Sequence, residues 1–307
     1  MLPFWTSIAV LSLAQGALVA VPGVLTAPWL ERASGRRWAA IPPASVIVFV
    51  LVAGAAERAS AQGLTYLALC AVPVLAALAL GWLAWNAHPP RPLRALLVLP
   101  LFAVAWVDRG GLLGESAALV LSGLSCVTLG VLLAAVTPPR WLAAGIVAMA
   151  VADTALVVSE QLQRPNNALN AAHPVAGLPR LQSAVFGSAA MGYGDLFVAA
   201  VLGALLAATA GRSLQLGAAR LTALLAVGFD LLFFAVNELP ATVPVALTLL
   251  LLLAVRRWRP SRPLRRARGS LLLGRGRPAA GPAATAQPPA PPGRTPARAG
   301  ARHPTVP

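Results

Sequence analysis

The stretch Met191-Gly192-Tyr193-Gly194-Asp195-Leu196-Phe197 decides the fold, because it places a carboxylate inside a long apolar run. That run extends from about residue 185 to 209 and is long enough to cross a bilayer as a helix. Placing a charged side chain at the centre of a bilayer costs about 3 kcal/mol or more, so such a residue marks a candidate functional site. Gly192 and Gly194 carry no side chain and let another backbone come close to the acid.

A second acid, Asp153, lies in the middle of the preceding apolar run, at about residues 141–159. The linker between the two runs brings the chain back to the membrane face that it left. At 1.5 Å per helical residue, Asp153 and Asp195 would lie roughly 10 and 15 Å from that face, counted from the expected ends of their helices. We therefore predict that adjacent helices bring the two carboxyl groups together as a catalytic pair.

The pairing of two carboxyl groups has a chemical rationale. Two such groups in contact cannot both ionise cheaply, so they hold one proton between them. The ionised group can take a proton from water as the water attacks a carbonyl carbon, while the protonated group donates to the carbonyl oxygen. The predicted reaction is peptide hydrolysis, without a covalent enzyme intermediate and without a metal or organic cofactor. The alternative is that the acids are structural, or belong to a proton or ion path.

The composition excludes an ordinary soluble protein, because 58% of the 307 residues are hydrophobic and only 11% are charged. The expected fold is all-α and polytopic, with residues 1–140 holding five helices, 141–258 the catalytic helices, and 259–307 an Arg/Pro/Ala-rich disordered tail. Hydropathy predicts about nine transmembrane helices. They fall at about residues 4–28, 41–56, 64–85, 93–107, 116–136, 141–159, 185–209, 218–236 and 241–255.

The net charge of +15 comes from 24 basic residues, all arginine, half of them at or after Arg256. The tail is therefore expected to contact membrane lipid, and no nucleic-acid partner is predicted. Arginines near the spans place the C-terminus in the cytoplasm. Arginine without lysine, together with abundant Ala and Pro, suggests a GC-rich bacterial genome and hence the bacterial inner membrane. Cys70 and Cys126 are expected to be buried thiols, with no disulfide and no metal site.

The two acid-bearing segments resemble the paired motifs of the GxGD intramembrane aspartyl proteases, which include presenilins and signal peptide peptidases. These segments are Val151-Ala152-Asp153-Thr154-Ala155 and Gly192-Tyr193-Gly194-Asp195, and Leu239-Pro240-Ala241 resembles the Pro-Ala-Leu motif of the same family. Ala152 replaces the usual Tyr before the first acid, and Thr242 replaces the final Leu of the last motif.

The resemblance implies that Asp153 and Asp195 are the catalytic pair. It also implies that the substrates are transmembrane peptides or signal peptides, whose helices must unwind locally before water can attack. The residues that it implies contact the substrate are Gly192, Tyr193, Gly194, Leu239, Pro240 and Ala241.

Three alternatives remain open. Prepilin peptidases carry a GxGD that opens an apolar helix, but a basic, Pro-containing segment closely follows their first acid, and Thr154–Ser159 does not supply one. A proton-coupled transporter could use Asp153, Asp195 and Asp230 as a relay, and a non-catalytic scaffold could keep the motifs as relics. We interpret Asp230 as structural or as lining a water path, and Glu238 as a residue at the membrane interface.

Overall fold

The computed structural model describes residues 2–85, 91–161, 163–172, 174, 177–236 and 239–258. These residues belong to one compact unit, Met1–Arg259. The predicted disordered tail, 259–307, lies outside the described residues, as do Asn237 and Glu238.

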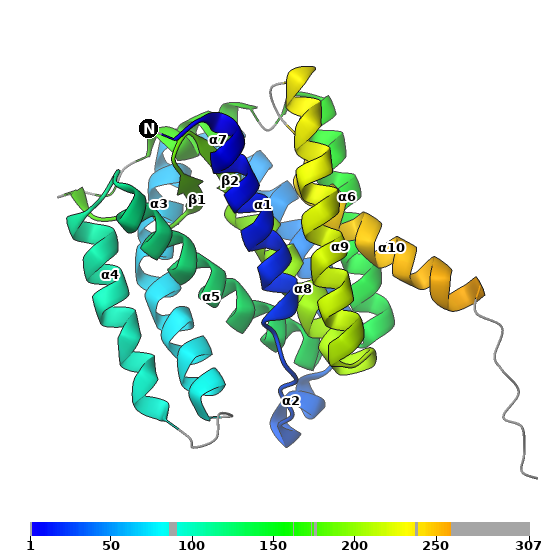
Figure 1. Ribbon diagram of the computed structural model, residues 1–307. Coiled ribbons are helices and arrows are strands. Elements are labelled where there is room, and N and C mark those ends of the chain that lie inside the picture. The colour runs from blue at the N-terminus through cyan, green and yellow to red at the C-terminus, as the bar shows by residue number, and fades with distance from the viewer. Residues whose placement is uncertain are drawn as a thin grey trace, which may run out of the picture. The chain divides into compact units, whose positions relative to one another are not determined.

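The described part of the chain is mostly helical, as the composition predicts, with one small β-hairpin (Figure 1). The α-helices are α1 (Phe4–Ala20), α2 (Pro28–Ala33), α3 (Ile41–Trp85), α4 (Val98–Val107), α5 (Leu112–Val136), α6 (Pro139–Val158), α7 (Gln163–Ala171), α8 (Tyr193–Thr209), α9 (Arg212–Asp230) and α10 (Val243–Trp258). The 3-10 helices are η1 (Arg36–Ala40), η2 (Pro92–Leu97) and η4 (Leu231–Phe234), and the hairpin strands are β1 (Ser183–Phe186) and β2 (Ala189–Gly192).

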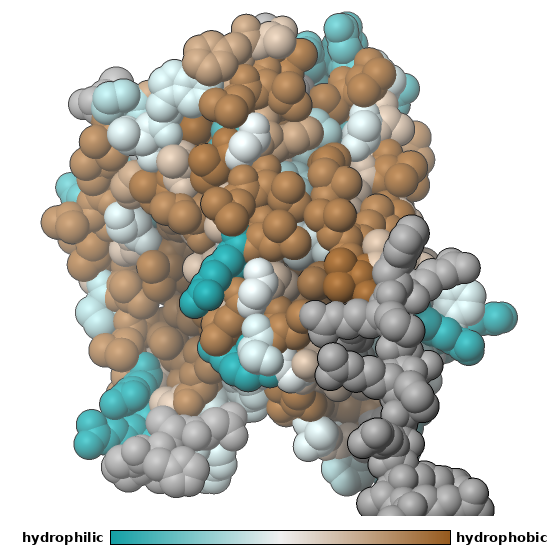
Figure 2. All heavy atoms as spheres, turned by 45° about the vertical axis from the view of Figure 1, so that its right-hand side comes forward, coloured by the Kyte–Doolittle hydropathy of each residue, from teal (hydrophilic) through white to brown (hydrophobic). Residues whose placement is uncertain are grey.

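Four helical segments are long and apolar enough to cross a membrane, namely Arg58–Trp85, Leu112–Val136, Pro139–Val158 and Arg212–Phe234. Shorter apolar helices include α1 and α8. Hydrophobic residues cover most of the middle of the face in Figure 2, and hydrophilic residues gather mainly near its upper and lower edges. Such a surface suits lipid and not water, so the chain is a membrane protein. The count of nine spans stays a prediction.

Two of the predicted span boundaries in the N-terminal part of the chain are wrong. The expected break between the second and third spans is absent, because α3 is helical throughout its 45 residues. The first span ends at Ala20 and not near residue 28, since Pro22 lies just beyond and a proline lacks the N–H that a helix interior needs. Cys70 is also exposed and not buried, whereas Cys126 is buried as expected. An apolar membrane helix can turn side chains toward lipid, so hydropathy does not predict burial within the protein.

The predicted seventh span begins eight residues later than hydropathy indicates. Residues 183–192 form the antiparallel hairpin, in which Phe186 pairs with Ala189 around a two-residue turn. Gly187 occupies that turn with φ of +58°, a conformation typical of tight hairpin turns. Asp195 therefore lies in the first turn of α8, and not ten residues inside a helix. A short apolar run gives the same hydropathy as a strand or as a buried helix, which explains the error.

Helix α8 forms the centre of the core, where Leu196, Ala199, Ala200 and Leu202 are almost fully buried. It packs against α1, α5, α6 and α9. Gly203 makes the closest approach, since a Cβ at this position would lie 2.5 Å from the carbonyl oxygen of Val19 in α1. Small residues of this kind let membrane helices pack at backbone contact, and they fix α8 firmly between its neighbours.

The hairpin is fastened to two helices. The Gly187 N–H donates to Oε2 of Glu115 at the start of α5, with a nitrogen–oxygen distance of 2.6 Å. The Ser188 N–H donates to the Ser7 hydroxyl of α1 at 3.2 Å. These contacts hold the strand that leads directly into Gly192 and Asp195.

Candidate active site

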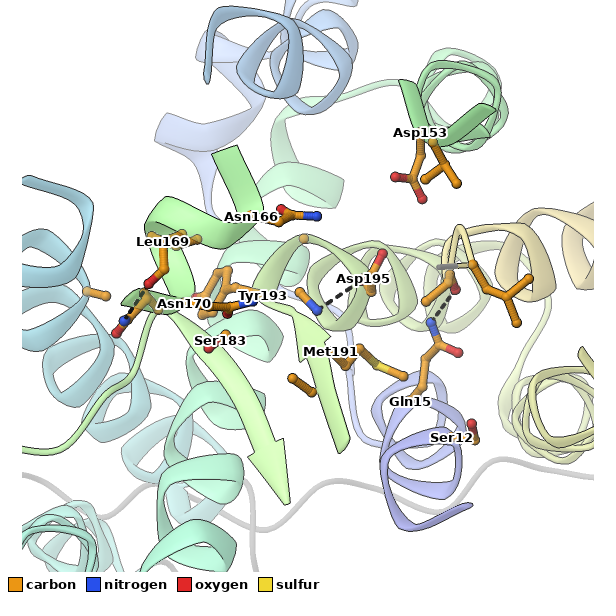
Figure 3. Close-up of a pocket in the computed structure, with 18 of the residues that line it drawn as sticks. Ser12, Gln15, Asp153, Asn166, Leu169, Asn170, Ser183, Met191, Tyr193 and Asp195 are labelled. Atoms are coloured by element: carbon orange, nitrogen blue, oxygen red, sulfur yellow. Dashed lines mark hydrogen bonds between the residues drawn. The ribbon is translucent and has the colours of Figure 1, made fainter. Parts of the chain in front are cut away.

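The two predicted catalytic acids line one cavity of about 620 Å³. Its walls come from α1, α3, α6, α7, the hairpin, the first turn of α8, α9 and the segment that precedes α10. Figure 3 shows Asp153 and Asp195 pointing toward one another across this space. Asp153 reaches the cavity from α6 and Asp195 from the first turn of α8. The structure therefore brings together the two acids that the sequence pairs.

Asp195 is held by its position at the start of α8. Its Oδ2 accepts the backbone N–H of Gly192 at 3.1 Å, as a capping carboxylate does at a helix N-terminus. The positive end of the helix dipole favours a carboxylate here. A Cβ on Gly194 would lie 3.7 Å from the terminal methyl of Met149 in α6. Gly194 therefore lies beside α6, the helix that carries Asp153, and a small side chain at this position would make an ordinary van der Waals contact.

Asp153 is held by a hydroxyl that sequence reasoning missed. The Thr242 hydroxyl donates to Oδ2 of Asp153 at 2.6 Å, and Thr242 is completely buried. Thr242 is the position at which the chain departs from the Pro-Ala-Leu motif. A leucine at this position could not donate the hydrogen bond that Thr242 gives to the candidate catalytic acid. A hydroxyl residue beside Pro240-Ala241, at the start of an apolar run, did not by itself indicate this role.

Each acid consequently has one fixed oxygen. Oδ2 of Asp195 accepts from the Gly192 N–H, and Oδ2 of Asp153 accepts from the Thr242 hydroxyl. Two carboxyl groups that are held in this way and meet can share a proton and activate a water molecule. That arrangement is what hydrolysis by a pair of aspartates requires.

Five of the six residues that are predicted to contact the substrate line the cavity, and one does not. Gly192, Tyr193, Gly194, Leu239 and Ala241 line the cavity, but Pro240 is buried and is not part of its wall. A hydrogen bond from α1 fixes the segment 239–241. The side-chain amide of Gln15 donates to the Ala241 carbonyl at 2.7 Å (Figure 3). Gln15 lies in α1, far from the motifs in sequence, so no local pattern could have identified it.

Tyr193 anchors the GxGD segment to α5. Its hydroxyl lies 2.7 Å from the Ser125 hydroxyl, which itself donates to the Ser122 carbonyl at 2.7 Å. Since Ser125 has one hydrogen to give, the Tyr193 hydroxyl must be the donor between them. The residue between the two glycines therefore orients the segment as well as lining the cavity.

Asp230 lines the same cavity from α9 and, like Asp153, accepts a hydrogen bond from a hydroxyl. The Ser12 hydroxyl of α1 donates to Oδ2 of Asp230 at 2.6 Å. The interpretation of Asp230 as structural or as lining a water path stays a prediction.

No group of three or more His, Cys, Asp or Glu side chains in the described ranges is arranged to hold a metal ion. The absence of a cofactor stays a prediction. Comparison of the chain with protein-family models, curated proteins and solved structures gives no match. A proposal for the function therefore depends on the geometry of the site and on the motifs.

Proposed function

We propose that the protein is an intramembrane aspartic endopeptidase of the GxGD type, with Asp153 and Asp195 as its catalytic residues. The observation that carries the proposal is the meeting of these acids in one cavity, each with one oxygen fixed by a hydrogen bond. The apolar middle of the face in Figure 2 suits an enzyme that works within the membrane.

In the proposed reaction one acid is ionised and the other is protonated. The ionised carboxylate takes a proton from a water molecule as the water oxygen bonds to the peptide carbonyl carbon, and the protonated acid donates to the carbonyl oxygen. The acid that took the water proton then donates it to the leaving nitrogen as the carbon–nitrogen bond breaks, and the other carboxylate takes a proton from a hydroxyl of the tetrahedral diol as the carbonyl forms again. Both acids return to their starting states, and no covalent bond to the enzyme forms.

The proposed substrates are transmembrane segments or signal peptides, with the enzyme in the bacterial inner membrane and its C-terminus in the cytoplasm. A substrate helix hides its carbonyl groups, so it must unwind beside the acids before water can attack. Gly192, Gly194, Leu239 and Ala241 line the cavity at that point. Membrane lipid is the expected surrounding partner.

A second candidate is a peptidase of the prepilin type, and two observations favour it. The GxGD segment opens α8, as it does in that family. A basic, Pro-containing segment does follow Asp153, as Arg164-Pro165 in α7, although it comes later than in that family. The next residue, Asn166, lines the cavity with the acids. The two candidates share the catalytic pair and differ in substrate.

The decisive experiment measures cleavage by purified protein in lipid, using a fluorogenic transmembrane peptide and a pilin-type leader peptide. Wild type, Asp153→Ala and Asp195→Ala are compared, with and without a transition-state-mimicking aspartyl protease inhibitor. Glu160→Ala removes an exposed carboxylate outside the cavity and is the matched control.

We expect both active-site variants to lose cleavage and Glu160→Ala to keep it. Whichever of the two peptides is cleaved faster identifies the substrate class. Cleavage that survives either substitution would refute the catalytic pair. If no form cleaves either peptide, while substrate flux depends on Asp153 and Asp195, the transporter interpretation replaces the peptidase.

A further inference from the structure

The inner side of α7 carries a set of amides that the proposed mechanism does not use. Asn166, Asn167 and Asn170 all line the cavity that contains the catalytic acids (Figure 3). Their spacing places the three side chains on neighbouring positions of one helical face. None of the three carboxamides is hydrogen-bonded to another described residue. We call these three residues the amide face.

The amide face is held in a fixed orientation by the segment that follows α7. The side-chain nitrogen of the buried Gln182 donates to the carbonyl oxygens of Leu169 at 3.4 Å and Ala172 at 3.2 Å. Arg180 donates to the Asn170 carbonyl at 3.0 Å. The last carbonyls of a helix have no partners within the helix, so these side chains cap α7 and fix its rotation.

An adjoining wall of the cavity is apolar. It is formed by Leu64, Leu67, Ala68 and Ala71 of α3, a helix that packs against α7. The cavity therefore offers hydrophobic side chains next to neutral amides. A substrate that fits both walls must itself change from apolar to hydrogen-bonding within a few residues.

A carboxamide carries both donors and an acceptor without a charge. It matches the N–H and C=O groups of an unwound peptide backbone better than it matches an ionised side chain, for which Arg or Asp would be the natural partner. We propose that the amide face is the subsite that binds extended substrate main chain next to the scissile bond, while the α3 wall holds the apolar part of the same substrate. This inference rests on the proposed peptidase function and adds to it that cleavage falls where an apolar segment ends.

The first test removes the amides and follows binding and cut position. Asn166→Leu combined with Asn170→Leu keeps the approximate side-chain size but removes the hydrogen-bonding groups. Asn166→Gln combined with Asn170→Gln keeps an amide at each position. Gln163→Leu is the matched control, because Gln163 is exposed on the same helix and does not line the cavity.

With a transmembrane peptide substrate in lipid, we expect the leucine pair to raise KM about tenfold, the effect of losing two hydrogen bonds, with kcat changed less than about twofold. Mass spectrometry of the products should show the cut moving away from the end of the apolar segment. The glutamine pair should restore most of the affinity, and Gln163→Leu should match wild type. An unchanged KM and cut position in the leucine pair would overturn the subsite while leaving the peptidase function intact.

The second test changes the substrate, so that it does not depend on the folding of a variant. Replacing single peptide bonds beside the scissile bond by esters removes one backbone N–H at a time. We expect one such ester to raise the wild-type KM about threefold or more, and to have no further effect in the leucine pair, because the same hydrogen bond is already lost. Equal ester effects in both enzymes would exclude contact between α7 and the main chain. If wild type cleaves no peptide at all, the proposed function fails and this inference fails with it.

Discussion

Two parts of the same cavity hold acids in different ways. At one part, α6 and α8 bring Asp153 and Asp195 toward one another, and each accepts a hydrogen bond at Oδ2, from the Thr242 hydroxyl and the Gly192 N–H. At the other, α1 and α9 hold Asp230 against the Ser12 hydroxyl, with no second acid facing it among the described residues. The difference teaches that an acid in a membrane helix does not by itself define catalysis. Two acids that face one another can share a proton and activate water, whereas an acid that faces only a hydroxyl has no second carboxylate with which to share a proton.

The largest expected effect on cleavage distinguishes the pair Asp153 and Asp195 from Asp230. Asp153→Asn or Asp195→Asn should lower kcat/KM by about 10⁴-fold or more, because removing one member of a catalytic pair removes the pair. Asp230→Asn should lower it by less than about tenfold, since its amide can still accept from Ser12. Steady-state cleavage of a fluorogenic transmembrane peptide measures both. Equal losses at all three positions would erase the distinction and favour a relay of three acids.

The next effect concerns the bond that fixes Asp153. Thr242→Val keeps the shape of the side chain but removes the hydroxyl, and we expect kcat to fall about 10- to 100-fold, the range for a hydrogen bond to a charged group. Thr222→Val is the matched control, because Thr222 bonds only the Thr248 hydroxyl between α9 and α10. The control should lose stability but keep kcat. A wild-type kcat in Thr242→Val would show that Asp153 needs no such partner.

A smaller effect is expected at the support of the hairpin. Glu115→Ala removes the acceptor of the Gly187 N–H, and the strand leading to Gly192 should become less well fixed. We expect kcat/KM to fall about three- to tenfold, comparable to one lost hydrogen bond. Glu115→Gln retains a carbonyl acceptor and should be close to wild type in the same cleavage assay. If the alanine and glutamine variants behave alike, the hairpin does not depend on this contact.

The smallest effect on activity is expected at Ser12. Ser12→Ala leaves Oδ2 of Asp230 without its donor, which should destabilise the fold by about 1–3 kcal/mol. The cleavage rate should stay within about twofold of wild type, because the catalytic pair keeps all its contacts. Thermal unfolding in detergent, followed beside the cleavage assay, measures the two quantities. A large loss of rate with unchanged stability would assign Asp230 to the catalytic machinery.

The parts of the site that could be predicted from the sequence are those that depend on residues rarely found within apolar segments. An acid in an apolar run is conspicuous, so Asp153 and Asp195 could be paired from the amino-acid sequence alone. The role of Thr242 could not be predicted from the sequence. A hydroxyl costs little free energy in an apolar helix, and only the hydrogen bond to Asp153 shows its role. The asparagines of α7 were missed for the opposite reason, since polar residues in a linker are ordinary.

The fold shows the same limit. Hydropathy identifies apolar stretches but does not report the backbone conformation within them, so it predicts helix for the hairpin before Asp195 and two helices for the continuous α3. Gly187 was the one local sign of a turn in the hairpin. The chemistry of two acids in contact does not depend on whether the approach to Asp195 is helix or strand. For that reason the two acids still meet in one cavity although the predicted depth of Asp195 is wrong.

The contacts between α1 and the last helices have a consequence for biosynthesis. Gln15 binds the carbonyl of Ala241, 226 residues later, and Ser12 binds Asp230, 218 residues later. Asp153 likewise receives its hydroxyl donor from Thr242, just before α10. A nascent chain inserted into the membrane up to α9 therefore contains Asp153 and Asp195 but not Ala241 or Thr242. Synthesis of the segment that leads into α10 supplies the hydroxyl donor of Asp153, so the candidate site is assembled late in the synthesis of the described part of the chain.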